Sequence, residues 1–211
     1  MKKLSLLVLG LLFFSCSSDD SNDTPDDSSN TVAFFKANLT NLSVNYTQDN
    51  SNSPSHFNQF IVGYSGNGSN KSFYYSSTME PLGLNDYPSL DITLHHMYQS
   101  TDESTETTSF NTIFSNKPTN FITSDQDFNW TKGVSVTYTD NNGDSYSTLS
   151  GSQTGSTINY TSTVAGTNSL TGLQTQTVSG TVACKLYKDS DPSIIINLTS
   201  GSFKLVFQEY D

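Results

Sequence analysis

The residues closest to a ligand-binding motif begin at Asp140. Asp140, Asn142 and Asp144 occupy the first, third and fifth positions of a loop like that of the EF-hand, which supplies oxygen ligands to calcium. The sixth position is Ser145 instead of glycine, and the twelfth is Gly151 instead of glutamate. A hairpin turn favours the same residue types for backbone reasons. We therefore expect a hairpin here, with calcium binding as a weaker alternative, and we predict no cofactor.

The histidines and serines show no catalytic signature. The nearest approach to the nucleophile elbow of serine hydrolases, G-x-S-x-G, is the segment 63–67, which lacks the last glycine and precedes no helical pattern. Three histidines, His56, His95 and His96, are the possible bases. His95 and His96 are neighbours on an expected strand, so they face opposite ways and cannot share one metal ion or substrate. We expect structural roles for them.

The acidic residues and cysteines also point away from catalysis. Paired carboxylates for glycoside hydrolysis need a separation that only the fold sets, and Glu103 and Glu106 lie in a polar run expected to be an exposed loop. Cys184 alternates with Val182 and Leu186, which predicts a buried apolar role for its side chain. The sequence thus predicts no enzyme, with a surface hydrolase of the glycoside hydrolase kind as the alternative.

Aromatic residues are the candidates for ligand binding. Trp130, the only tryptophan, lies at an expected loop-to-strand junction, and Tyr74 and Tyr75 lie on opposite faces of one expected strand, so one of them should be exposed. Exposed aromatic rings beside Asn and Asp form sugar-stacking platforms in glycan-binding sandwiches. For Trp130 the alternative is core packing or anchoring of a loop.

The amino-terminal residues resemble a bacterial lipoprotein signal. Lys2 and Lys3 precede an apolar run over residues 4–14, which is shorter than the roughly 20 residues that span a membrane, and Cys16 follows it. In the lipoproteins that this pattern resembles, the cysteine is lipidated and the signal is cut before it. Phe13 and Phe14 depart from the usual lipobox, and an ordinary secretory signal is the alternative. Several acyl chains would make the anchor stable, at about 0.8 kcal/mol per buried methylene.

The residues after Cys16 resemble the acidic export signal of Bacteroidota surface lipoproteins. Ser17, Ser18, Asp19 and Asp20 carry this resemblance. It implies an outer-membrane protein displayed on the cell surface, with display on the periplasmic face as the alternative. Residues 16–30 also have the polar, acidic composition of a disordered tether. We therefore divide the chain into a signal peptide (1–15), a tether (16–30) and a folded domain (31–211).

Charge excludes one class of partner. All nine basic residues are lysines, and residues 31–211 carry seven Lys against fifteen Asp and Glu. Nucleic-acid binding relies on clustered basic side chains that neutralise phosphates, so we expect no nucleic-acid partner. An acidic surface rich in Ser, Thr and Asn also repels anionic polymers.

Period-two alternation of apolar residues dominates the folded domain. It predicts strands within 32–39, 57–64, 71–77, 90–99, 134–139, 144–150, 156–164, 178–187 and 194–210, and the phase change at Gly201 predicts a bulge or a tight turn. Ile158, Tyr160 and Ser162 should share one face. Helical spacing of apolar residues predicts a short helix near 107–115. We expect an antiparallel β-sandwich of about nine to eleven strands, with a β-barrel as the alternative.

Two stretches, residues 136–162 and 200–207, resemble segments of uncharacterised Bacteroidota surface lipoproteins built as β-sandwiches. The resemblance implies a fold and a location and brings no catalytic residues. Together these features predict a lipid-anchored surface protein that binds a glycan or a protein without catalysis. The alternatives are the surface hydrolase and a purely structural or adhesive surface protein.

Overall fold

The computed structural model describes residues 31–51, 54–65, 70–83, 86–99, 104–124 and 132–210. The predicted signal peptide and tether therefore lie outside the described residues. The elements are, in chain order, β1 (Thr31–Leu39), β2 (Leu42–Asp49), β3 (His56–Ser65), β4 (Asn70–Pro81), β5 (Ser89–Gln99), α1 (Ser104–Ser115), β6 (Gly133–Thr139), β7 (Ser145–Ser147), the 3-10 helix η1 (Thr148–Ser150), β8 (Thr157–Thr167), β9 (Gln174–Lys188) and β10 (Asp191–Gln208).

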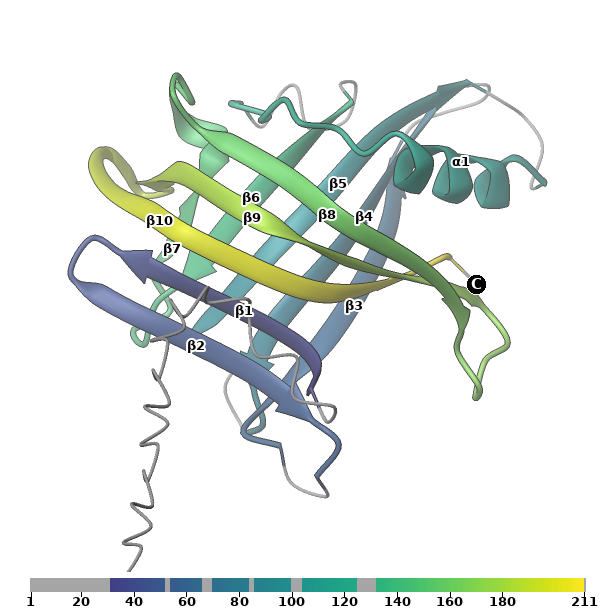
Figure 1. The fold of residues 1–211 in the computed structure, drawn as a ribbon. Coiled ribbons are helices and arrows are strands. Elements are labelled where there is room, and N and C mark those ends of the chain that lie inside the picture. Colours follow the sequence, from purple (N-terminus) through teal and green to yellow (C-terminus); the bar gives the residue numbers. More distant parts are fainter. Residues whose placement is uncertain are drawn as a thin grey trace, which may run out of the picture.

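The ten strands form one antiparallel sheet, which confirms the predicted all-β fold. The strand order is β2-β1-β10-β9-β7-β6-β5-β4-β3, and β8 branches from this path by pairing with β9. The sheet folds over itself, so that the layer of β1, β2, β8, β9 and β10 crosses the layer of β3 to β6 (Figure 1). β10 packs across β3 and β4, and the sheet is not closed into a barrel.

The hydrophobic core fills the space between the two layers, because apolar residues alternate along each strand and face inward. Val182, Cys184 and Leu186 face inward from β9, as predicted. The following large side chains are completely or almost completely buried: Phe35, Tyr75, Met79, Leu90, Ile92, Leu94, Leu186, Phe203, Leu205 and Phe207. All of these come from strands, and Phe110 and Ile113 of α1 add completely buried side chains to the same core.

The helix α1 covers one open end of this core, as Figure 1 shows. Its apolar residues Phe110, Ile113 and Phe114 are buried, and the ring of Phe114 lies 5.1 Å from that of Phe207. The helix was predicted near 107–115, and it begins three residues earlier, at Ser104. Spacing of apolar residues locates the buried face of a helix better than its first turn.

Polar side chains join the two layers beside the end of β1. Asn58 in β3 accepts a hydrogen bond from the backbone N–H of Val206 in β10 at 2.7 Å, and Ser77 in β4 donates one to the Val206 carbonyl at 2.7 Å. Asn58 also donates to Ser77 at 2.8 Å. The pairing of β1 with β10 stops at Lys204, so these side chains satisfy backbone groups that no strand reaches.

Two predictions of side-chain phase have different outcomes. The phase change in β10 is a bulge between Leu198 and Gly201, with Ser200 at a φ of 50°, so one of the two predicted possibilities is confirmed. Ser162 was predicted to share a face with Ile158 and Tyr160, and this is wrong. A bulge between Tyr160 and Ser162 moves Ser162 to the outer face of the sheet.

Candidate ligand-binding groove

Three adjoining hollows lie along the outer face of β9 and β10, on the side opposite the core. Their volumes are about 370, 240 and 190 Å³. Thr181 and Ser202 line both the first and the second hollow, and Ala183 lines both the second and the third. We call this row the outer groove. It follows β10 from Leu198 to Lys204, which corresponds to roughly 20 Å at about 3.3 Å per residue.

Small side chains make the floor of the outer groove. On β9 the outward-facing residues are Ser179, Thr181 and Ala183, which alternate with the inward-facing residues of the core. At Gly180 an added Cβ atom would lie 2.3 Å from the carbonyl oxygen of Asn159 and 2.7 Å from the ring of Phe203. Glycine therefore allows β8 and the Phe203 ring to approach β9 closely.

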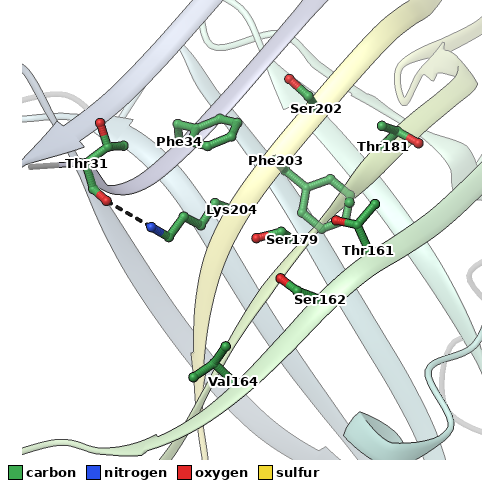
Figure 2. A pocket seen from close by; sticks show the side chains of 11 residues that line it. Thr31, Phe34, Thr161, Ser162, Val164, Ser179, Thr181, Ser202, Phe203 and Lys204 are labelled. Carbon is green, nitrogen blue, oxygen red and sulfur yellow. Dashed lines mark hydrogen bonds between the residues drawn. The ribbon is translucent and has the colours of Figure 1, made fainter. Parts of the chain in front are cut away.

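Larger side chains form the rim of the widest hollow, as Figure 2 shows. Phe34 lies on β1, and the ammonium group of Lys36 is 5.2 Å from the centre of its ring. Val164 lies opposite on β8 and is 61% exposed. Lys204 crosses the hollow and donates a hydrogen bond to the carbonyl of Thr31 at 3.1 Å.

Most hydroxyl groups of the widest hollow are available to a ligand. Six hydroxyl residues line it, and five of them have side chains that hydrogen-bond to no other described residue: Thr161, Ser162, Ser179, Thr181 and Ser202. Each hydroxyl can donate one hydrogen bond and accept two. Lys185 and Lys204 are the charged residues that line the three hollows, and the lining contains no carboxylate. The groove thus combines hydroxyls, the aromatic rings of Phe34 and Phe203, and ammonium groups on a protein with a net charge of −11.

The two tyrosines predicted to bind a ligand are not both accessible. Tyr75 is completely buried, and its ring packs edge-on against Phe110 at 5.1 Å. Tyr74 lies on the opposite face, half-buried, with its ring over Gly63 and 6.4 Å from the ring of His95. The strand alternation is as expected, but Tyr74 is only partly exposed, because its ring lies against Gly63 of β3. Phe34 and Phe203 both line the outer groove, and Phe34 is the more accessible because Phe203 is 1% exposed. Neither was predicted from the sequence to bind a ligand.

Several predicted functional residues lie outside the described residues. These are Trp130, the lipidation site Cys16, and the export signal Ser17, Ser18, Asp19 and Asp20. They remain predictions. Glu103 and the side chain of Glu106 also lie outside the described part.

The candidate calcium ligands lie in the β6–β7 hairpin, which was predicted. Asp140 Oδ1 accepts hydrogen bonds from the backbone N–H groups of Asn142 at 2.8 Å and Asp144 at 3.0 Å. Asp144 Oδ2 lies 2.6 Å from the ammonium nitrogen of Lys188. Gly143 has a φ of 81°, a conformation that glycine adopts readily. Asp140, Gly143 and Asp144 therefore stabilise the hairpin turn, which accounts for the residue types found there.

The described residues include two serine–histidine contacts. Ser55 Oγ and His56 Nδ1 belong to neighbours in the chain and lie 3.0 Å apart at the surface, whereas the second pair is buried. His95 Nε2 lies 3.0 Å from Ser135 Oγ, the pairing that a nucleophile and its base require, but the two residues are 0% and 2% exposed. Burial raises the pKa of the Cys184 thiol to about 12, so the thiol stays protonated and unreactive at neutral pH. Neither the His95–Ser135 pair nor the Cys184 thiol lies where a substrate could reach it in this conformation.

Comparison of the chain with family models, curated proteins and solved structures finds no match. In the part of the chain that the structure describes, no helix has the length and hydropathy needed to cross a membrane.

Proposed function

We propose that this protein is a lipid-anchored module of the outer-membrane surface that binds a glycan in the outer groove without catalysis. The observation that carries the proposal is the set of five unengaged hydroxyls beside Phe34 in a hollow of about 370 Å³. A sugar ring offers hydroxyls on its rim and C–H groups on its faces, so it needs both kinds of partner. The outer groove presents both within one hollow.

The shape of the groove supports a chain-like ligand. The three hollows adjoin one another along β10, so several units of a polymer can bind side by side. A net charge of −11 repels strongly anionic polymers, although Lys185 and Lys204 tolerate an isolated acidic group. We therefore expect neutral polysaccharides to bind better than polyanionic ones.

The location of the protein is part of the proposal. Lipidation of Cys16 would hold the chain at the membrane, and the acidic residues 19 and 20 would direct it to the cell surface. A tether over residues 16–30 would span roughly 20 Å as a random coil, which separates the folded domain from the lipid headgroups.

The test is native electrophoresis of the whole chain, purified in a mild detergent, through gels that contain neutral or anionic polysaccharides. We expect a neutral polysaccharide to retard the protein, and Phe34→Ala or Thr181→Gln to abolish the retardation. Thr181 lines two of the hollows, so a longer side chain there fills the groove. The matched control is Tyr210→Ala, which removes a 41% exposed ring that does not line the groove.

Two outcomes would overturn the proposal. Retardation that is unchanged in Phe34→Ala and Thr181→Gln would place binding elsewhere on the protein. Reducing ends that appear over time in the same gels would show hydrolysis and contradict the non-catalytic assignment.

A further inference from the structure

The strand β8 has one hydrogen-bonding edge that no described strand occupies. β8 pairs with β9 along its length, and no described residue outside β9 hydrogen-bonds to its backbone. The other two ends of the sheet, β2 and β3, approach each other. There the ring of His56 stacks on that of Tyr46 at 4.6 Å, and the Gln48 side chain accepts the Asn58 N–H at 2.7 Å. In β8, Tyr160 donates a hydrogen bond to the Pro118 carbonyl at 2.7 Å, so the first half of the strand also has a neighbour. Residues 162–167 have no such contact with a described residue outside β9.

The sequence of β8 lacks the usual protection of an exposed edge. Natural proteins guard such edges with charged residues, proline or bulges. Residues 157–167 contain no charged residue and no proline, and the one bulge lies between Tyr160 and Ser162. After that bulge the residues 162–167 pair with β9 in unbroken register, and all of them except Thr163 are exposed. This stretch can accept another extended strand along its open edge.

Charge indicates which partner fits this edge. Residues 145–184 form forty consecutive positions without Asp, Glu, Lys or His, although the whole chain has a net charge of −11. A second acidic copy meets repulsion over most of the surface, whereas residues 157–184 of the β8–β9 hairpin carry no charge of their own. The partner that this uncharged edge suits best is therefore a second copy of the same acidic chain.

Exposed apolar side chains gather on the same hairpin. Leu170, in the turn that follows β8, is 94% exposed, and Val164 within β8 is 61% exposed. If two copies pair antiparallel about a twofold axis that passes beside Ala165, Ala165 of each copy lies opposite Ala165 of the other, and Val164 lies opposite Gly166. The same twofold pairing would bury apolar surface that the single chain leaves in water.

We propose that the protein forms a twofold homodimer by antiparallel pairing of β8 with β8 of a second copy, through residues 163–167. The two sheets then continue into each other, and the two outer grooves lie on the same face of the joined sheet. Such an arrangement strengthens the binding of any polymer long enough to reach both grooves. The dimer itself does not depend on what the outer groove binds.

The test co-expresses two copies of the whole chain with different carboxyl-terminal tags, extracts them in detergent and isolates one tag. We expect the other copy to be recovered with it. Ala165→Lys in both copies should lower the recovery at least tenfold, because like charges then meet next to the twofold axis. Ser190→Lys, which adds the same charge in the exposed β9–β10 turn, should leave the recovery unchanged.

A cysteine variant tests the same contact without adding charge. Ala165→Cys should form a disulfide-linked dimer in oxidised cell envelopes, whereas Ser190→Cys should not, and the buried Cys184 should contribute nothing in either case. The proposal is wrong if the wild-type copies are not recovered together. It is also wrong if Ala165→Lys leaves recovery unchanged, or if both cysteine variants cross-link equally.

Discussion

Two outer faces of the sheet are built from the same hydroxyl residues and use them in opposite ways. On β4 and β5, Ser76, Thr78 and Thr93 all donate hydrogen bonds to the carboxylate of Asp91, at 3.0 Å for Thr78 and 2.7 Å for Thr93. We call these four residues the Asp91 cluster. In the outer groove, the hydroxyls of Ser179, Thr181 and Ser202 contact no described polar partner.

The difference shows that hydroxyl content alone does not identify a binding surface. In the Asp91 cluster the hydroxyls compensate a carboxylate that is largely removed from water, so they serve the fold. In the outer groove no buried charge requires them, so they remain available to an external ligand. If this comparison is right, substitutions in the Asp91 cluster change stability, whereas substitutions in the groove change binding.

The largest effect on stability is expected from Asp91→Ala. Removing the carboxylate leaves three hydroxyls without their acceptor in a poorly hydrated site, which should lower the free energy of unfolding by about 1–3 kcal/mol. Urea unfolding followed by tyrosine fluorescence or circular dichroism measures the change. A loss of unfolding free energy below about 0.5 kcal/mol, which is the usual effect of a surface substitution, would contradict the role assigned to the cluster.

A second, smaller effect concerns pH. Burial raises the pKa of Asp91, and the three hydroxyl donors oppose this shift only in part. The folded protein therefore holds this proton to higher pH than the unfolded chain does. The contribution of Asp91 to stability is greatest below the unfolded pKa of about 3.9 and declines as pH rises through the higher folded pKa.

Asp91→Asn removes the titration and keeps a side chain of the same shape. The difference in stability between wild type and this variant should shift in favour of the variant as pH rises from about 3.5 to 7. Unfolding curves of both proteins across that range give the comparison. A shift in the other direction would mean that the hydroxyls, and not burial, dominate the pKa of Asp91.

The smallest effect on stability is expected from Thr181→Ala in the outer groove. Its hydroxyl has no partner among the described residues and its side chain is exposed, so the free energy of unfolding should change by no more than about 0.5 kcal/mol. The measurement is the same urea unfolding used for Asp91→Ala. A loss of more than 1 kcal/mol would show that the groove residues support the fold and would remove the contrast between the two faces.

Much of the fold was predictable because local patterns carry it. The alternation of Val182, Cys184 and Leu186 defined the inward face of β9, and the spacing of Phe110, Ile113 and Phe114 defined the buried face of α1. β2 was not predicted, since Val44 and Tyr46 are its only buried residues and the rest of its sequence is polar. The face of Ser162 was mispredicted because a bulge depends on pairing between strands, which composition does not reveal.

The candidate site was less predictable than the fold. Tyr75 was predicted as a possible ligand-binding residue because it is aromatic, but it is completely buried in the core. The outer groove consists of unremarkable Ser, Thr and Gly residues that four strands bring together, and no local pattern marks them. One signal was present in the sequence: the forty uncharged positions from 145 to 184 contain β8 and most of β9, which form much of the groove.

The most direct test of the proposed function compares wild type, Phe34→Ala and Tyr210→Ala in the same polysaccharide gels, after unfolding curves have shown equal stability. We predict that a neutral polysaccharide retards wild type and Tyr210→Ala alike, and that Phe34→Ala loses at least ten-fold in apparent affinity, which is about 1.4 kcal/mol. Equal retardation of all three proteins would contradict the assignment of the outer groove as the binding site.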